Sequence, residues 1–364
     1  MGGEELDFVK DAFEKNWIAP VGPHISDFEK ELSNISENFN VAAVSSGTSA
    51  IHLALLLLSV QPGDEVICSS FTFAASANPI KYIGATPVFV DSENETWNMC
   101  PKMLEKAITD RINNYKKPKA NIIVHLYGMP ANINEIVKIA NNYSIPIIED
   151  AAEALGSKYF DQQLGTFGEF GVYSFNGNKI ITTSSGGALL SKQIKLIDKA
   201  KFLATQARDD APHYQHSNIG YNYRMSNVCA SIGLGQIKVL KDRVNRKRYI
   251  NDYYKKKLAH IPFISFLEER KFCKSNFWLT TIVLSAESTI DKEKFRLFME
   301  KNNIEVRPLW KPMHLQPIYK DSPSYINGVS EDLFNRGLCL PSGTNMKIDD
   351  LERVIKCINQ LYEI

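Results

Sequence analysis

Residues 145–187 read IPIIEDAAEALGSKYFDQQLGTFGEFGVYSFNGNKIITTSSGG, and this stretch decides the fold of the chain. It opens with an apolar run, residues 145–148, which ends abruptly in Glu149 and Asp150. An apolar run of this length that ends in charge is typical of a buried strand whose C-terminal end reaches a site. Asp150 is therefore the first candidate functional residue.

A second apolar run, residues 171–175, predicts another buried strand. Asn-Gly-Asn at residues 176–178 is turn chemistry, and Lys179 follows it as the only cation between Lys158 and Lys192. Two interpretations of Lys179 are open. It is an ordinary surface lysine at a loop tip, which is common, or a desolvated amine that can form a Schiff base.

Small hydroxyl residues gather after a third buried run, residues 41–44, in the sequence SSGTSA at residues 45–50. At the start of a helix, backbone N–H groups point outward and the helix dipole favours an anion such as phosphate. Ser and Thr also serve as plain N-caps, so this signal alone leaves both interpretations open. Beside Asp150 and Lys179 the phosphate interpretation is favoured. The candidate ligands are Gly47, Thr48 and Ser49.

Strands and helices alternate through the first part of the chain. Strands are predicted at residues 41–44, 65–69, 87–90, 121–125 and 145–148, and helices near residues 73–83, 101–112 and 133–143. This alternation predicts an α/β fold with a mostly parallel central sheet and helices on both faces. Functional groups are expected at the C-terminal ends of the strands. The G-x-G-x-x-G pattern of dinucleotide folds is absent, which argues against an NAD enzyme.

The chain after about residue 240 has the pattern of a smaller α+β lobe. Its strands are predicted near residues 264–267, 277–284 and 304–308, and its helices near residues 291–301, 331–336 and 349–362. Before it, the sequence predicts helices at residues 4–15 and 192–204 and one long helix at residues 227–259. We therefore expect a large domain, residues 1–240, and a small C-terminal domain, residues 241–364.

EDAAEALGS and GTFGEFGVYSFNGNKIITT resemble the core of the pyridoxal-phosphate (PLP) sugar aminotransferases of the DegT/DnrJ type, and the resemblance runs from about Gly2 to the C-terminus. It implies PLP fold type I, the fold of aspartate aminotransferase. It also implies that Lys179 carries the cofactor, in its PLP and PMP forms, and that Asp150 holds the pyridine nitrogen. GTSA matches the phosphate loop of the family.

The resemblance implies further cofactor contacts. Phe73 sits where the family places an aromatic ring over the pyridine face, although core packing explains it equally well. Ser174 matches a hydroxyl that the family uses on the phosphate. In GYNYRMSN, Asn222 matches a residue that reaches the phosphate of the neighbouring subunit. Glu153 sits where the family often has Gln or His near the ring hydroxyl, so its role is open.

Substrate contacts are implied at three places. Trp17, Ile18 and Ala19 belong to a Pro- and Gly-rich loop that matches a loop over the active site, although packing alone also explains them. Arg224 contacts a sugar-nucleotide phosphate or forms a structural ion pair, and the ion pair is slightly favoured. His314, in RPLWKPMH, belongs to a segment that resembles the lining of the sugar-nucleotide pocket.

Composition excludes several other classes of protein. The formal net charge of +1 gives no electrostatic reason to bind nucleic acid or an anionic membrane. The six cysteines have no CxxC pair and no zinc spacing, which predicts free thiols in a reducing cytoplasm and no metal site. The longest apolar run, residues 50–60, is too short to insert in a membrane. The N-terminus is acidic and is not a signal peptide.

The function that the resemblance implies is transfer of an amino group from L-glutamate to C4 of a nucleotide-linked 4-keto-6-deoxy sugar, for bacterial surface glycans or glycoproteins. Within the family the chain looks closest to the bacillosamine-pathway enzymes, which favours UDP-2-acetamido-4-keto-6-deoxyhexose as acceptor. A GDP-perosamine synthase-type enzyme is the alternative. A PMP-dependent sugar dehydratase, whose branch replaces the cofactor lysine with His, and a non-enzymatic regulator are less favoured.

The segment that contains Asn222 is polar and has little apolar content to pack in its own chain. We therefore expect a homodimer in which each active site is shared. The sequence departs from the family pattern at Ser184 and Ser185, where related chains have glycines. If a glycine is needed there for backbone shape, the geometry of this loop differs from that of the family.

Overall fold

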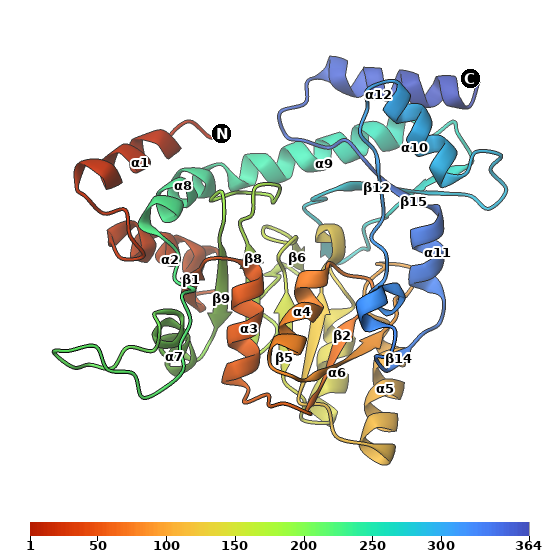
Figure 1. Cartoon of the computed structure of the whole chain (residues 1–364). Coiled ribbons are helices and arrows are strands. Elements are labelled where there is room, and N and C mark those ends of the chain that lie inside the picture. The colour runs from red at the N-terminus through yellow and green to blue at the C-terminus, as the bar shows by residue number, and fades with distance from the viewer. Residues whose placement is uncertain (364) are drawn as a thin grey trace.

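The computed structural model describes residues 1–363, and its largest sheet has the strand order β1-β9-β8-β5-β4-β2-β3-β14 (Figure 1). Its strands are β1 (Asn40–Val44), β2 (Glu65–Ser69), β3 (Thr86–Val90), β4 (Ala120–Val124), β5 (Ile147–Asp150), β8 (Phe170–Ser174), β9 (Gly187–Ser191) and β14 (Ser324–Tyr325). Among them β9 alone runs antiparallel to its neighbours. The mostly parallel sheet predicted from the sequence is confirmed. Ile364, the last residue of the predicted C-terminal domain, lies outside the described residues.

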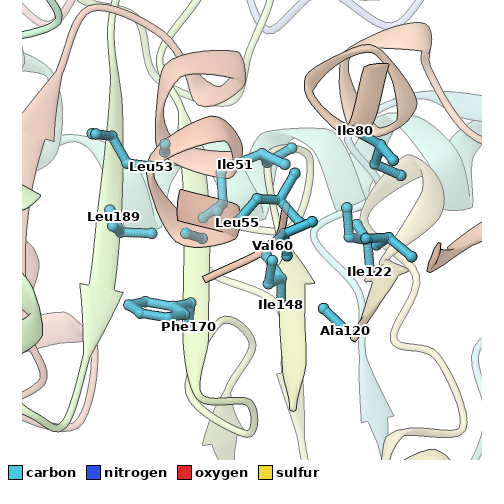
Figure 2. Packing of buried hydrophobic residues seen from close by; sticks show 14 of the residues in the cluster. Ile51, Leu53, Leu55, Val60, Ile80, Ala120, Ile122, Ile148, Phe170 and Leu189 are labelled. Atoms are coloured by element: carbon cyan, nitrogen blue, oxygen red, sulfur yellow. The ribbon is translucent and has the colours of Figure 1, made fainter. Parts of the chain in front are cut away.

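Helices cover both faces of this sheet, as predicted. One face carries α3 (Gly47–Leu57), α4 (Ala74–Tyr82) and α7 (Ile194–Ala204). The other carries α2 (Pro23–Ile35), α5 (Pro101–Asn114), α6 (Ile133–Asn142) and α8 (Asn227–Lys238), with α1 (Glu5–Glu14) packed against α8. Figure 2 shows apolar side chains of α3, such as Ile51 and Leu55, gathered near Ile148 and Phe170 of the sheet.

Alternation along β5 determines where the functional groups face. Ile147 packs in the cluster with α5 and α6, whereas Ile148 packs in the cluster with α3 and α4. Because side chains alternate between faces along a strand, Glu149 follows Ile147 and Asp150 follows Ile148. The strand extends through Asp150 instead of ending at Ile148. Asp150 therefore emerges at the C-terminal end of β5 on the α3 and α4 face.

The sequence was wrong about one long helix and missed another helix. The expected helix over residues 227–259 is two helices, α8 and α9 (Leu240–Lys257), because Val239 leaves helical geometry with φ −102° and ψ 8°. The sequence reading also missed α2 after the Pro- and Gly-rich loop. Pro23 is the first residue of α2, a position where proline costs nothing because its missing N–H would have no helical partner.

The C-terminal part builds a second sheet with the order β10-β12-β15-β13. Its strands are β10 (Ile264–Phe266), β12 (Thr280–Leu284), β13 (Arg307–Pro308) and β15 (Gly337–Leu340). It packs with α9, α10 (Lys292–Lys301) and α12 (Ile348–Leu361), and α11 (Val329–Arg336) lies beside β12 and β15. A smaller sheet joins β11 (Cys273–Lys274), β6 (Lys158–Tyr159) and β7 (Gln162–Gln163).

The two parts of the chain are interlocked through β14. This strand comes from beyond residue 240 yet pairs in parallel with β3 at the edge of the large sheet. Next to it the fully buried carboxylate of Asp91 accepts hydrogen bonds from the amides of Asn327, Gly328 and Ser330, at 2.9–3.2 Å. The division at residue 240 stays a prediction. No helix within residues 1–363 is both long enough and apolar enough to cross a membrane.

Candidate active site

A cavity of about 270 Å³ opens at the C-terminal ends of the parallel strands. Lys179 and Asp150, the two residues singled out first from the sequence, both line it. The loop after β1, the loop after β2 and the ends of β5 and β8 supply most of the remaining lining. From the predicted cofactor set the lining includes Gly47, Thr48, Phe73, Asp150, Glu153, Ser174 and Lys179.

The carboxylate of Asp150 is fixed from two sides. Its Oδ2 accepts a hydrogen bond from Ser76 Oγ at 2.6 Å, and its Oδ1 accepts one from the amide of Ala152 at 3.1 Å. Ser76 is itself 2.7 Å from the hydroxyl of Thr72. Ser76 comes from the first turn of α4, so helix and strand together orient one buried acid. Hydrogen bonds to an ionised acceptor are among the stronger ones in proteins.

Lys179 extends into the same cavity from the loop between β8 and β9. Its side chain is 11% exposed, and its Nζ lies 3.5 Å from Glu153 Oε1. The Nζ also lies 4.2 Å from the centroid of the Trp278 ring. This environment contradicts the surface-lysine interpretation, because the amine is enclosed between a carboxylate and an aromatic face. It fits the desolvated amine instead.

Glu153 is a buried acid with a perturbed pKa. Burial raises the pKa of the carboxyl from 4.5 to about 7, although the nearby Lys179 charge and the Tyr127 amide act in the opposite direction. The amide of Tyr127 donates to its Oε2 at 2.7 Å. At neutral pH this side chain can therefore exchange a proton with a group in the cavity.

The far end of the cavity is suited to an anion. Ser46 caps α3 by accepting the Ser49 amide at 3.0 Å, while the amides of Gly47 and Thr48 lie in the first turn and have no intrahelical partner. A Cβ at Gly47 would lie 3.2 Å from the Cβ of Ser174, so a glycine lets the two loops approach closely. The helix dipole adds to the attraction for a phosphate.

These residues fit PLP. An enclosed amine, a buried acid with fixed orientation and a helix N-terminus beside a serine match the aldehyde, the pyridine nitrogen and the phosphate of that molecule. Ser49 is the exception within the predicted set. Its hydroxyl is turned into the loop, 3.0 Å from Ser45 Oγ and 2.8 Å from Ser46 Oγ, and it does not line the cavity. Ser49 contributes to the site indirectly, because its amide is the donor in the N-cap that starts α3.

Several predicted substrate residues lie outside the cavity of their own chain. Trp17 and Ile18 are 42% and 49% exposed, and their loop is held by Asn227, which bonds the carbonyl groups of Trp17 and Ala19 at 2.9 Å. Arg224 forms a short ion pair with Glu29 Oε1 at 2.5 Å and also donates to the carbonyl of Ala43. In this structure Arg224 therefore forms the structural ion pair that the sequence slightly favoured.

Asn222 and His314 are also placed away from the cavity. Asn222 is exposed and accepts a hydrogen bond from Gln206 at 3.1 Å, in a segment that projects from the body of the chain after α7 (Figure 1). His314, in the short turn Met313–Leu315, is 2.6 Å from Ser70 Oγ and 3.1 Å from Glu331 Oε1. Each ring nitrogen has its own partner, so the imidazole links three segments of the chain. His314 does not line the cavity.

Among the lining residues that sequence reasoning missed, four contribute polar or aromatic side chains that matter for the chemistry: Thr72, Ser76, Trp278 and Trp310. Thr72 and Ser76 follow β2, and a signal was present, because Ser76 is one helical turn beyond Thr72 at a strand end. Trp278 and Trp310 come from the C-terminal part. Trp310 lies in the same segment as His314, with its ring 5.3 Å from that of Phe73. The predicted segment does reach the cavity, through its tryptophan.

Comparison with known proteins agrees with this geometry. The model of the DegT/DnrJ/EryC1/StrS aminotransferase family matches residues 1–359. The chain is 50% identical to EpsN of Bacillus subtilis (strain 168), named as a pyridoxal phosphate-dependent aminotransferase, over 100% of this chain and 94% of that protein. It is 38% identical to a GDP-perosamine synthase of Escherichia coli O157:H7, over 99% and 96% of the two chains.

A solved structure shows the same fold. The sugar aminotransferase Spr1654 of Streptococcus pneumoniae, in its PLP form, superposes with a TM-score of 0.91 at 26% identity. The match covers 99% of this chain and 96% of that one. The predicted PLP fold type I is confirmed.

Proposed function

This chain belongs to the DegT/DnrJ/EryC1/StrS aminotransferase family, and from that premise we propose that it transfers the amino group of L-glutamate to C4 of a nucleotide-linked 4-keto-6-deoxy sugar. The coarser activity, that of a PLP-dependent sugar aminotransferase, follows from the family and its relatives. The donor, the position on the ring and the nucleotide are the proposal.

One observation carries the chemistry: the amine of Lys179 and the carboxylate of Asp150 share one enclosed cavity. PLP, when bound, supplies an aldehyde that holds the amino group and a ring that accepts electron density. Asp150 would keep the ring nitrogen protonated. Lys179 would hold the cofactor at rest and, once freed, would carry the proton between carbon atoms. Glu153, with its pKa of about 7, is placed to exchange a proton with Lys179 across 3.5 Å.

The cavity mouth supports a deoxygenated sugar as acceptor. Phe73 and Trp310 lie side by side there, with ring centroids 5.3 Å apart and ring planes tilted by 50°, and both line the cavity. Aromatic faces pack well against the methyl group and the C–H face of a 6-deoxy sugar. We favour UDP-2-acetamido-4-keto-6-deoxyhexose, because the overall resemblance of the sequence is to bacillosamine-pathway enzymes. A GDP-linked sugar is the second candidate, because several relatives are named GDP-perosamine synthase.

A matched assay tests both the chemistry and the choice of sugar. UDP- and GDP-linked 4-keto-6-deoxy sugars are each incubated with the enzyme and L-glutamate, and the amino sugar and 2-oxoglutarate are measured together. We expect both products with the UDP sugar and none with Lys179→Ala. Exclusive use of the GDP sugar would select the second candidate. Turnover by Lys179→Ala would overturn the mechanism.

We also propose a cytoplasmic homodimer with shared sites. Asn222 is exposed in its own chain, and the segment around it exposes Tyr214 and Ile219 to 80% and 84%. Two exposed apolar side chains on one projecting segment support burial of that segment by a second copy. A two-fold dimer would bring each Asn222 to the phosphate end of the partner cavity. The six cysteines are free thiols, which suits a reducing compartment.

A further inference from the structure

We propose that Trp278 is a catalytic residue: its indole face binds the ammonium form of Lys179 each time the amine, freed from the cofactor, has taken up a proton. The inference rests on the PLP chemistry of the family and is independent of the identity of the sugar. The contact with Trp278 gives the freed Lys179 amine a defined position while the cofactor carries the amino group that is being transferred.

The contact is direct and buried. The Nζ of Lys179 lies 4.2 Å from the centroid of the Trp278 ring, and Trp278 is 2% exposed. A cation over a tryptophan face within about 6 Å is attracted by the ring quadrupole, and the attraction is strongest where water is excluded. Trp278 also lines the cavity, so its ring is part of the surface that meets the cofactor and its substrates.

The ring is held in this position from several directions. Its Nε1–H donates to the carbonyl of Asn178 at 2.8 Å, and Asn178 is the residue immediately before Lys179. Its backbone amide donates to Asn276 Oδ1 at 2.8 Å, and its carbonyl accepts from Lys247 Nζ at 2.7 Å. The indole therefore cannot turn away without breaking its bond to the loop that carries the catalytic amine.

The same network connects to the acid on the other side of the amine. Asn276 donates from Nδ2 to the carbonyls of Glu153 and Leu155, at 2.8 and 3.0 Å. One buried amide thus fixes both the tryptophan and the backbone that presents Glu153. Lys179 Nζ lies between the Trp278 face and the Glu153 carboxylate, which is 3.5 Å away.

Glu153 and Trp278, the two partners of the Lys179 amine, differ in whether their attraction for a cation depends on protonation. Glu153 loses its negative charge when it takes up a proton, so it cannot neutralise the ammonium in every step. The ring carries no net charge and attracts the cation regardless of the protonation of Glu153. We therefore infer that Trp278 retains the ammonium when Glu153 is neutral.

The test replaces Trp278 site-specifically with tryptophans that carry one to four ring fluorines. Each fluorine weakens the negative face of the ring with little change in shape. The apo-enzyme is treated at fixed pH with formaldehyde and a borohydride, and methylation of Lys179 is followed by peptide mass spectrometry. Because only the unprotonated amine reacts, we expect the rate to rise with each fluorine, by about tenfold across the series.

A purely structural role predicts a different result. Fluorination strengthens the indole N–H as a donor, so the bond to Asn178 would be kept and the rate would stay flat. The same series at Trp310, which lines the same cavity without contacting Lys179, is the matched control and should leave the rate unchanged. Trp278→Phe, which keeps an aromatic face, should lie closer to the wild type than Trp278→Leu.

A flat series at Trp278, or an equal response at Trp310, would overturn the inference. Neither result would affect the assigned aminotransfer, which the Lys179→Ala assay tests separately. The measurement is made on the apo-enzyme, so it does not depend on having the correct sugar.

Discussion

Ser76 holds the carboxylate of Asp150 through a 2.6 Å hydrogen bond, one turn into the helix that follows β2. We expect Ser76→Ala to lower kcat by about ten- to a hundredfold, because the loss of a hydrogen bond to a charged group costs about 1.5–3 kcal/mol. Steady-state kinetics with saturating PLP measure the change. Ser69→Ala is the control, since the buried Ser69 hydroxyl has no partner among the described residues. Equal losses in both variants would refute a specific role.

Asp150→Asn should retain PLP but slow the proton-transfer step by orders of magnitude. The amide has the shape of the acid without the charge that keeps a ring nitrogen protonated. Stopped-flow absorbance during the glutamate half-reaction separates binding from proton transfer. A rate near that of the wild type would show that another group does this work.

Glu153 makes the stability of the apo-enzyme depend on pH. Its pKa is raised from 4.5 to about 7, so the folded chain binds the proton more tightly than the unfolded chain. This contribution is fully present below pH 4.5 and is lost as the pH rises through 7. It amounts to about 3 kcal/mol at about 1.4 kcal/mol per unit. Glu153→Gln should therefore gain Tm relative to the wild type on going from pH 5 to pH 8.

The measurement that decides is how the difference in Tm between Glu153→Gln and the wild type changes from pH 5 to pH 8. A difference in Tm that is the same at pH 5 and pH 8 would mean that Glu153 does not titrate between these values. Glu169→Gln replaces a carboxylate near the surface and should show no such pH dependence.

His314 positions the segment that contains Trp310. Glu331 can only accept a hydrogen bond, so Nε2 of His314 carries the proton and Nδ1 accepts from Ser70. His314→Ala should raise the KM for the sugar several-fold with a smaller effect on kcat, because the aromatic wall at the cavity mouth loses its anchor. His260→Ala, at an exposed position, is the control. A change confined to kcat would contradict the positioning role.

Shared active sites predict complementation between inactive chains. Lys179→Ala and Asn222→Ala chains are mixed under conditions that exchange subunits. Each heterodimer then has one site with both residues intact, so a random mixture should recover about a quarter of the wild-type activity. Each variant incubated alone provides the baseline. Absence of recovery in verified heterodimers would exclude the shared site.

The cavity residues that the sequence singled out first are those with a local signature. Asp150 ends an apolar strand and Lys179 follows a strand and a tight turn, so each was recognisable from a few neighbours. Trp278 was not, because its partners Asn178 and Lys179 lie far away in the chain and only folding brings them together.

Residue type alone also cannot give the direction of a side chain. RPLWKPMH was expected at the cavity with His314 as its contact, and the segment reaches it through Trp310. Pro23 was interpreted as a break in structure, although it begins α2. In the first case the pattern identified the segment and tertiary packing decided which side chain reaches the cavity, whereas in the second the helix itself was missed.

Because β14 pairs with β3, the C-terminal third of the chain covers an edge of the large sheet that would otherwise be open. A fragment that stops near residue 240 would leave the edge of β3 without its neighbour and Asp91 without its three amide donors. An open strand edge is a template for pairing with other chains, and Asp91 would be left with the Ser92 amide as its donor. Such a fragment should form aggregates on expression, and nascent chains would face the same hazard until the ribosome has released the last third.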